Sequence, residues 1–309
     1  MSLKYAVIGT GAIGGYYGGM LAKARKEVHF LLHSDYEYVK ENGLRVDSIG
    51  GNFHLKQVNV YRHTEDMPLC DVVLVCLKST NNVLLKDILP PLLHENTLVI
   101  LIQNGLGIEA DLAQNFPSLK NIAGAMAFIC SNKMGPGYIA HLDEGSINIG
   151  LYKGDADFLE QVNTDFSESA IKSRIVDLEP ARWKKLIWNI PYNGMTVVLN
   201  TTTDRLMKHP ASRQLIYELM QEVIGAANKV GEGRFSVPES FADSMMETTD
   251  RMTPYSPSMK LDYDNKRTLE IEYIYSRPVA EALKAGFDMS KVSMLEKQLR
   301  FIQSQYLKS

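Results

Sequence analysis

Tyr5-Ala6-Val7-Ile8-Gly9-Thr10-Gly11-Ala12-Ile13-Gly14 is the stretch that decides the fold of this chain. Its first four residues predict a buried strand, and the glycines that follow open a helical pattern that ends near Arg25. Glycines at this spacing permit a tight turn, let the backbone approach a pyrophosphate and let the helix pack closely on the strand. The N–H groups at the start of a helix bind anions. We therefore predict a dinucleotide-binding turn made of Gly9, Thr10, Gly11, Ala12, Ile13 and Gly14.

The residues after this turn bear on which dinucleotide binds. Residues 27–32 read as a second strand, which completes a strand–turn–helix–strand unit of roughly 30 residues. A glycine turn in an unrelated α/β domain is the alternative. An acidic residue at the end of the second strand is typical of NAD sites, whereas this chain has His33-Ser34, which can donate hydrogen bonds to the 2′-phosphate of NADP. We expect NADP, although Asp35 would serve NAD if the turn were one residue longer.

The rest of the chain separates into a strand-rich part and a helical part. Apolar runs rich in β-branched residues predict further parallel strands at 72–77, 98–102 and 122–128, then shorter antiparallel strands at 138–142 and 146–151 and another strand at 174–178. Long helical patterns follow at 181–199, 212–230, 268–285 and 290–307. The sequence thus predicts an α/β Rossmann-type dinucleotide-binding domain over residues 1–178, followed by an all-α domain over residues 179–309.

Composition indicates an ordinary globular enzyme. The chain has 309 residues, of which 45% are hydrophobic and 22% charged, and its net charge of −3 gives no basis for a nucleic-acid or membrane partner. No segment approaches the roughly 18 apolar residues of a membrane span. The three cysteines are too few and too irregular for a disulfide framework or a metal site. The chain begins without a signal peptide, so we expect a cytoplasmic protein, and its apolar C-terminal helices are compatible with a homodimer.

Two polar residues follow predicted strands at the carboxyl edge of the sheet, where open α/β sheets bind ligands. Lys78 comes after the strand that ends near Leu77, beside the expected cofactor phosphates or nicotinamide. A solvated lysine at a strand end is the alternative. Asn104 offers a donor and an acceptor in a glycine-containing turn, although Asn-Gly is also a common turn dipeptide.

The most specific pattern lies at the start of the helical part. Lys185, Asn189 and Asn193 stand at i, i+4 and i+8, so a helix would align them as one polar stripe. Their neighbours are mostly apolar, and asparagine is a poor residue for a buried helix interior, so the stripe suggests a function. Pro191 predicts a bend between the two asparagines.

At this point the chain resembles the ketopantoate reductases, also called 2-dehydropantoate 2-reductases, over nearly its whole length. The family's glycine turn, lysine and Asn-Gly turn are matched by residues 9–14, Lys78 and residues 104–105. Its Trp-x-Lys-Leu-x-x-Asn-x-x-x-Asn signature is matched by residues 183–193. Its Ser-Met-x-x-Asp segment is matched by residues 258–262, and Glu270 stands at the family's glutamate position.

The resemblance implies an NADPH-dependent reduction of a small 2-oxo acid at a cleft between two domains. It makes Lys185 the general acid, and the negative charge that develops on the carbonyl oxygen agrees with an ammonium donor there. It implies that Asn189 and Asn193 bind the substrate and that Ser258 hydrogen-bonds its carboxylate. Lys78 and Asn104 would position both the nicotinamide and the reacting carbonyl, and Glu270 would contact the cofactor ribose or a lysine of the site. Taken alone, Ser258 also fits a helix cap after Pro257, and Glu270 a solvated helix face.

The chain also departs from the family pattern. His33 replaces the arginine often found at the 2′-phosphate position, and Pro191-Tyr192 replace small apolar residues before the second asparagine. A relative that reduces another 2-oxo acid therefore stays open, as do another β-hydroxyacid dehydrogenase and an NADP-binding sensor without turnover. The retention of Lys185, Asn189, Asn193, Ser258 and Glu270 favours an enzyme.

Overall fold

The chain divides into two compact units. The structure, a computed structural model, describes residues 2–252, 254 and 256–307. Unit 1 comprises Met1–Gln103 and Ile108–Leu178, and unit 2 comprises Asn104–Gly107 and Glu179–Ser309. Each unit has its own core of buried apolar side chains. The short segment Asn104–Gly107 therefore belongs with the helical part, although its chain neighbours on both sides lie in unit 1.

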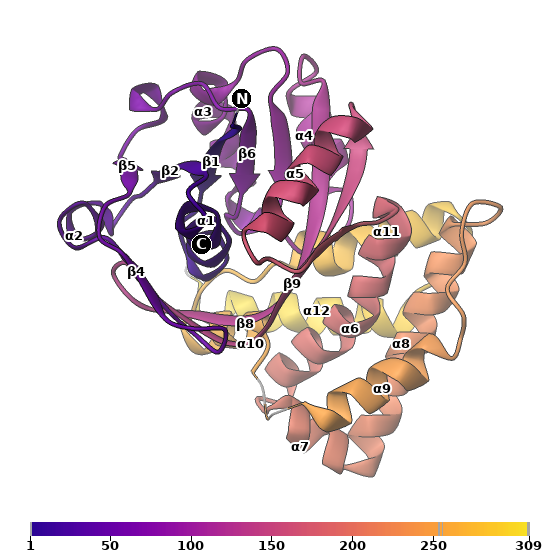
Figure 1. Ribbon diagram of the computed structural model, residues 1–309. Helices are drawn as coiled ribbons and strands as arrows, with labels where there is room; N and C mark the ends of the chain where they lie inside the picture. The colour runs from indigo at the N-terminus through magenta and orange to yellow at the C-terminus, as the bar shows by residue number, and fades with distance from the viewer. Residues whose placement is uncertain (1, 253, 255, 308–309) are drawn as a thin grey trace. The chain divides into compact units, whose positions relative to one another are not determined.

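The centre of unit 1 is a parallel sheet in the order β5–β2–β1–β6–β7–β8 (Figure 1). Its strands are β1 (Lys4–Ile8), β2 (Glu27–Leu31), β5 (Asn59–Tyr61), β6 (Val72–Val75), β7 (Leu98–Leu101) and β8 (Asn121–Gly135). This order is that of dinucleotide-binding sheets, in which ligands bind at the carboxyl ends of the strands where the order reverses, here between β1 and β6. The predicted strands in this part are confirmed. β5 was not predicted, because a strand of three residues is too short to show a pattern.

A long hairpin extends the sheet beyond β8. β9 (Tyr138–Lys153) is one strand where two shorter ones were predicted, and it pairs antiparallel with β8. The apparent break is a bulge at Gly145, because Phe128 pairs with Ser146 and the next residue, Ile129, pairs with Glu144. Three strands that flank β9 directly or through a neighbour complete the sheet: β3 (Leu44–Ser48), β4 (Phe53–Leu55) and β10 (Ser173–Ile175). The strand expected at 174–178 is therefore shorter, since a helix already begins at Leu178.

Short helices connect the strands of unit 1. The first, α1 (Ala12–Lys23), packs so closely on the sheet that a Cβ at Gly18 would lie 2.6 Å from the Phe30 ring. Its glycine content thus reflects close packing as well as the turn. The other helices are α2 (Tyr36–Asn42), η1 (Thr64–Asp66), η2 (Ser79–Leu84), α3 (Leu85–Ile88), η3 (Pro90–Leu92), α4 (Ile108–Asn115) and α5 (Ala156–Glu168).

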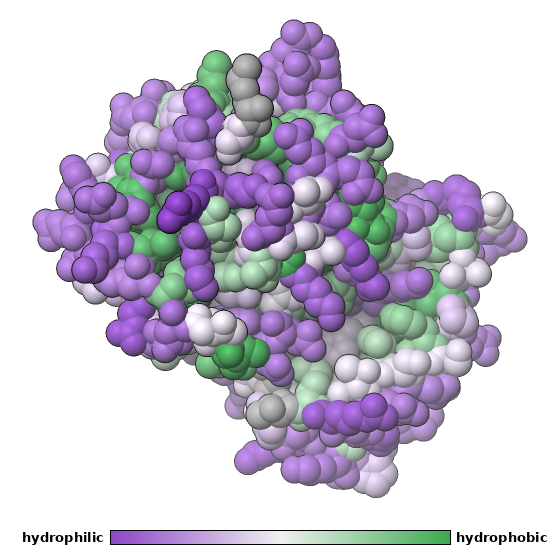
Figure 2. Space-filling view, in the orientation of Figure 1, coloured by the Kyte–Doolittle hydropathy of each residue, from purple (hydrophilic) through white to green (hydrophobic). Residues whose placement is uncertain are grey.

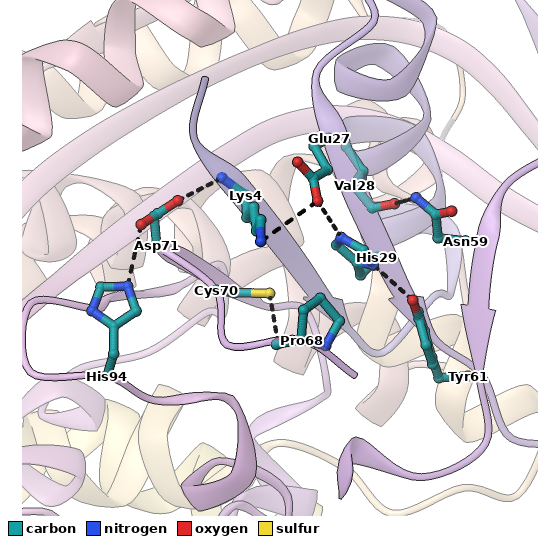
Figure 3. A network of polar contacts seen from close by, with 10 residues as sticks. All are labelled: Lys4, Glu27, Val28, His29, Asn59, Tyr61, Pro68, Cys70, Asp71 and His94. Atoms are coloured by element: carbon teal, nitrogen blue, oxygen red, sulfur yellow. Dashed lines mark hydrogen bonds and ion pairs between the residues drawn. The ribbon is translucent and has the colours of Figure 1, made fainter. Parts of the chain in front are cut away.

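Polar side chains link the amino ends of the central strands (Figure 3). The backbone N–H of Lys4 donates to Asp71 at 2.8 Å, and the Lys4 ammonium lies 4.0 Å from Glu27. His29 bridges Glu27 and the Tyr61 hydroxyl, at 3.2 and 3.0 Å. These contacts join β1 and β2 to the short strand β5 at the edge opposite to the glycine turn.

Unit 2 is helical. It contains α6 (Leu178–Val198), α7 (Thr203–Lys208), α8 (Pro210–Val230), α9 (Phe241–Arg251), α10 (Ser258–Asp264), the π-helical segment η4 (Glu272–Ser276), α11 (Arg277–Lys284) and α12 (Ser290–Ser304). The helices expected at 181–199, 212–230 and 290–307 are confirmed within a few residues, and α7, α9 and α10 were not predicted. The single helix expected at 268–285 is wrong in its first part, because residues 267–270 are not helical and a π-helical segment follows.

The surface of unit 1 that faces the viewer is mainly hydrophilic, with hydrophobic side chains in small separate groups (Figure 2). Within residues 2–252, 254 and 256–307, no helix combines the length and the hydropathy that a membrane span requires.

Candidate functional site

The three glycines of the turn have different surroundings. Gly9 has a φ of +89°, and a Cβ there would lie 2.7 Å from the backbone nitrogen of Leu77. A Cβ at Gly14 would lie 2.4 Å from the carbonyl oxygen of Gly9, so this glycine is needed for helix-on-strand packing. A Cβ at Gly11, by contrast, would meet no described atom within 4 Å. The fold thus requires Gly9 and Gly14, whereas the space beside Gly11 is where the backbone of such turns receives a pyrophosphate.

The end of β2 lacks an available acid in the position typical of NAD sites. The Thr10 hydroxyl donates to Leu31 O at 3.1 Å, which ties the turn to β2, and the exposed His33 follows shortly after. Asp35 is only 6% exposed and accepts hydrogen bonds from the Gly137 N–H at 3.0 Å and from the Lys133 ammonium at 2.7 Å. Burial alone would raise the pKa of Asp35, but the Lys133 ammonium, the Gly137 N–H and the Ser34 hydroxyl together hold the pKa below its usual value. Asp35 therefore fastens the β8–β9 turn, which argues against its use for ribose.

Lys78 follows β6 and is itself the N-cap residue of η2. The two neighbouring strand ends are joined by Gln103, which donates to Leu77 O and to Asn82 Oδ1, both at 2.7 Å. Sequence reasoning missed Gln103, whose position directly before Asn104 was the available signal. The half-buried Lys78 is thus held on a cross-linked loop.

The Asn104 turn docks onto the π-helical segment of unit 2. Gly105 has a φ of +117°, and a Cβ there would lie 2.5 Å from the Tyr273 side chain. The N–H of Leu106 donates to the carbonyl oxygen of Tyr273 at 2.9 Å. π-Helical turns often occur at functional sites, because they release backbone groups for other partners. Tyr273 was not singled out from the sequence, since its contact arises only in the folded unit.

The predicted polar stripe lies on α6. Asn189 and Asn193 are 4% and 2% exposed, and Lys185 is half-buried. The Asn189 amide donates to Asn104 Oδ1 at 3.4 Å, so the stripe and the Asn104 turn meet. Burial, aided by the nearby Arg182 charge, lowers the pKa of Lys185 to about 8. A lysine with such a pKa can both give and regain a proton near neutral pH.

One atom of the stripe makes no hydrogen bond. Oδ1 of Asn193 is buried and has no partner among the described residues. Such an orphaned acceptor costs about 1–3 kcal/mol, and substrate groups that donate a hydrogen bond fit it. Tyr192, the departure noted in the sequence, turns away into the helical core, where its hydroxyl lies 3.0 Å from the Met207 sulfur. Pro191 lies inside α6, which continues through it to Val198.

The two remaining predicted residues lie on other elements of unit 2. Ser258 is the first residue of α10, directly after Pro257, and is half-buried. Glu270 is 7% exposed and precedes the π-helical segment, so a solvated helix face does not describe it. In the part of the chain that the structure describes, no three His, Cys, Asp or Glu side chains converge to hold a metal ion.

Known protein families and proteins resemble the chain over nearly its whole length. The family model described as ketopantoate reductase PanE/ApbA matches residues 5–154, and its C-terminal counterpart matches residues 177–303. The chain belongs to the ketopantoate reductase family. It is 46% identical over 306 residues to the 2-dehydropantoate 2-reductase of Nostoc sp., covering 97% of this chain and 95% of that protein. Membership makes it an NAD(P)-dependent oxidoreductase and confirms the predicted enzyme class.

Solved structures share the fold. The 2-dehydropantoate 2-reductase of Geobacter metallireducens superposes with a TM-score of 0.93 at 39% identity, covering 97% of this chain and 99% of that one. A D-mandelate dehydrogenase solved with NADH and anilino(oxo)acetate superposes with a TM-score of 0.88 over 98% of this chain and 99% of that one, at 20% identity, which speaks to the fold alone. The expected combination of a Rossmann-type domain with a helical C-terminal domain is confirmed.

Proposed function

We propose that this protein reduces ketopantoate to pantoate with NADPH, with Lys185 as the proton donor. The observation that carries the proposal is the buried face of α6, on which Lys185 has a pKa of about 8 and Asn189 contacts Asn104. The relative from Nostoc that shares 46% of its residues is named for this activity. In this proposal unit 1 is the cofactor-binding domain and unit 2 the catalytic domain.

The residues of unit 1 suit the cofactor, which supplies a hydride when bound. Residues 9–14 bind the pyrophosphate through backbone N–H groups, and the open space beside Gly11 supports this role. His33 donates to the 2′-phosphate, a role supported by the commitment of Asp35 to the β8–β9 turn. Lys78 orients the nicotinamide end of the cofactor and the carbonyl of the substrate.

Lys185 completes the reduction. As hydride reaches the 2-oxo carbon, the carbon–oxygen double bond becomes a single bond and negative charge develops on the oxygen. The Lys185 ammonium donates a proton to that oxygen, which gives a 2-hydroxy acid and a neutral amine. With a pKa of about 8, Lys185 is mostly protonated at pH 7 and regains its proton readily from water.

The neighbouring polar groups hold the substrate. The buried Oδ1 of Asn193 accepts a hydrogen bond from the terminal hydroxyl of ketopantoate, because that acceptor has no partner among the described residues. Asn189 and Asn104 orient the reacting carbonyl as a bonded pair. Ser258 donates to the substrate carboxylate, and Glu270 binds the cofactor ribose.

The test measures NADPH oxidation with ketopantoate, pyruvate and 2-oxoisovalerate, with NADH as a second cofactor. The enzymes compared are the unchanged protein, Lys185→Ala and Lys184→Ala. Lys184 is exposed on the same turn of α6 and is therefore a matched control. We expect ketopantoate turnover to fall at least about a hundredfold in Lys185→Ala and to be unchanged in Lys184→Ala.

Other outcomes would overturn parts of the proposal. Turnover of another 2-oxo acid in preference to ketopantoate would reassign the substrate and leave the role of Lys185 intact. Tight NADPH binding without turnover of any 2-oxo acid would indicate a sensor. Equal losses in both lysine variants would remove the proton-donor assignment.

A further inference from the structure

The short strand β5 brings an arginine to the end of β2. In the register of the sheet Leu31 pairs with Tyr61, and the N–H of Leu32 donates to Tyr61 O at 2.9 Å. Arg62 is the next residue after β5 and therefore lies beside the β2–α2 connection that contains His33. Since β1, β2 and β5 are parallel neighbours, their carboxyl ends share one edge of the sheet with the glycine turn.

Side-chain contacts fix β5 in this position. Asn59 donates from Nδ2 to Val28 O at 3.1 Å, and the Tyr61 hydroxyl lies 3.0 Å from His29 Nδ1 (Figure 3). Both contacts anchor a three-residue strand that backbone pairing alone would hold weakly. The place of Arg62 is thus built into the sheet rather than left to a mobile loop.

The charges around Arg62 suit a phosphate. Its guanidinium lies 4.8 Å from the centroid of the Tyr36 ring, with the Lys40 ammonium 5.4 Å from the same ring. Arg62 is 50% exposed and pairs with Glu37 through Nη2 at 2.5 Å. A guanidinium has five N–H donors in a fork that matches a phosphate, so one carboxylate does not exhaust it.

The two acidic side chains near Arg62, Asp35 and Glu37, are each already paired with a cation. Asp35 is bound to Lys133 and to the Gly137 N–H. Glu37 is an exposed carboxylate whose charge Arg62 balances. Without Arg62, the unbalanced charge of Glu37 would repel a 2′-phosphate.

We propose that Arg62, presented by β5 beside the connection that contains His33, is the cation that binds the 2′-phosphate of NADPH, with Glu37 as its counter-ion when no phosphate is bound. The inference rests on the proposed NADPH dependence and adds the residue that decides it. Arg62 is a specificity-determining residue and takes no part in the chemical step.

The test is calorimetric binding of NADP⁺ and NAD⁺ to the full chain, which needs no turnover. We expect Arg62→Ala to weaken NADP⁺ binding about 10- to 100-fold and to change NAD⁺ binding less than about twofold, because only NADP⁺ carries the phosphate. Glu37→Gln should tighten NADP⁺ binding and leave NAD⁺ binding within about twofold. Unchanged NAD⁺ affinity also reports that the variant site is folded.

A matched control comes from the same unit. Arg45 is exposed, pairs with Asp47 at 2.7 Å and stacks 4.8 Å from the Tyr138 ring, as Arg62 does with Glu37 and Tyr36, but it lies on β3. Arg45→Ala should leave both affinities unchanged.

The outcomes separate the two proposals. If the unchanged protein prefers NADP⁺ and Arg62→Ala keeps that preference, the Arg62 assignment fails and the NADPH dependence stands. If Arg62→Ala weakens both ligands equally, Arg62 has a structural role and the assignment fails. If the unchanged protein binds NAD⁺ with the same affinity as NADP⁺, both the NADPH preference and the Arg62 assignment are overturned.

Discussion

Asn189 donates a hydrogen bond from its side-chain amide to Oδ1 of Asn104, 3.4 Å away and 85 residues earlier in the chain. The bond joins the polar stripe of α6 to a turn that the chain enters directly from β7 and Gln103. It is long for a hydrogen bond, so it adds little stability by itself.

We expect Asn104→Ala and Asn189→Ala each to lower kcat/KM for ketopantoate about 10- to 100-fold, because each removes a positioning group. The double variant should lose less than the product of the two single losses, since the residues act as a pair. Steady-state kinetics of the unchanged protein, the two single variants and the double variant give this double-mutant cycle. Fully multiplicative losses would contradict a joint role.

The pKa of Lys185 predicts a pH profile. The donor must be protonated, so kcat/KM for reduction should be level at neutral pH and fall about tenfold per pH unit above a pKa of about 8. An activity that stays level to pH 10 would contradict Lys185 as the acid with this pKa.

The same shift predicts a stability effect of known sign. Between the folded pKa of about 8 and the usual lysine value of 10.5, the folded protein binds fewer protons than the unfolded chain. The buried charge therefore lowers the free energy of unfolding by its full amount below pH 8, and this loss disappears above pH 10.5. Lys185→Met should therefore raise Tm at pH 7, and the gain should vanish toward pH 10.5. Thermal unfolding at several pH values measures this, with Lys184→Met as the control. A gain that is constant across this pH range would show that it comes from packing rather than from the charge.

Gly11→Ala and Gly14→Ala separate the cofactor role of the turn from its structural role. A Cβ at Gly14 would clash with Gly9 O at 2.4 Å, so Gly14→Ala should lower Tm by several degrees or prevent folding. A Cβ at Gly11 meets nothing within 4 Å in the described chain, so Gly11→Ala should keep Tm and weaken NADP⁺ binding at least about tenfold. Thermal unfolding and calorimetry give the two readouts. Unchanged NADP⁺ affinity in Gly11→Ala would contradict the phosphate cradle.

Asn193→Leu should lower the activity without lowering the stability of the protein. The variant removes a buried acceptor without a partner among the described residues, so Tm should stay equal or rise while kcat/KM for ketopantoate falls at least about tenfold. Tyr192→Phe is the control, because Tyr192 faces the core and should leave kinetics unchanged. A large fall in Tm for Asn193→Leu would show instead that the amide supports the fold.

Much of the fold could be read locally. The glycine turn, the parallel strands and the long helices each follow from a pattern within 20 residues or so, and such periods are set by backbone geometry. The elements that were missed or misjudged depend on distant partners. β5 is held by β2, β9 is continuous because β8 pairs along its whole length, and the helix expected from residue 268 includes a π-helical turn whose Tyr273 carbonyl binds Leu106.

The sequence by itself determined the family, the glycine turn after β1 and the stripe formed by Lys185, Asn189 and Asn193, because these depend on residue type and spacing along one element. Only the tertiary structure decided which charged side chains lie near the end of β2 and which partners they bind. Asp35 is turned to Lys133 and Gly137, whereas Arg62 is carried to the β2 end by a neighbouring strand. The physical reason is that strand pairing and burial act between segments far apart in the chain. A pattern of neighbouring residues does not show which distant segments will pair.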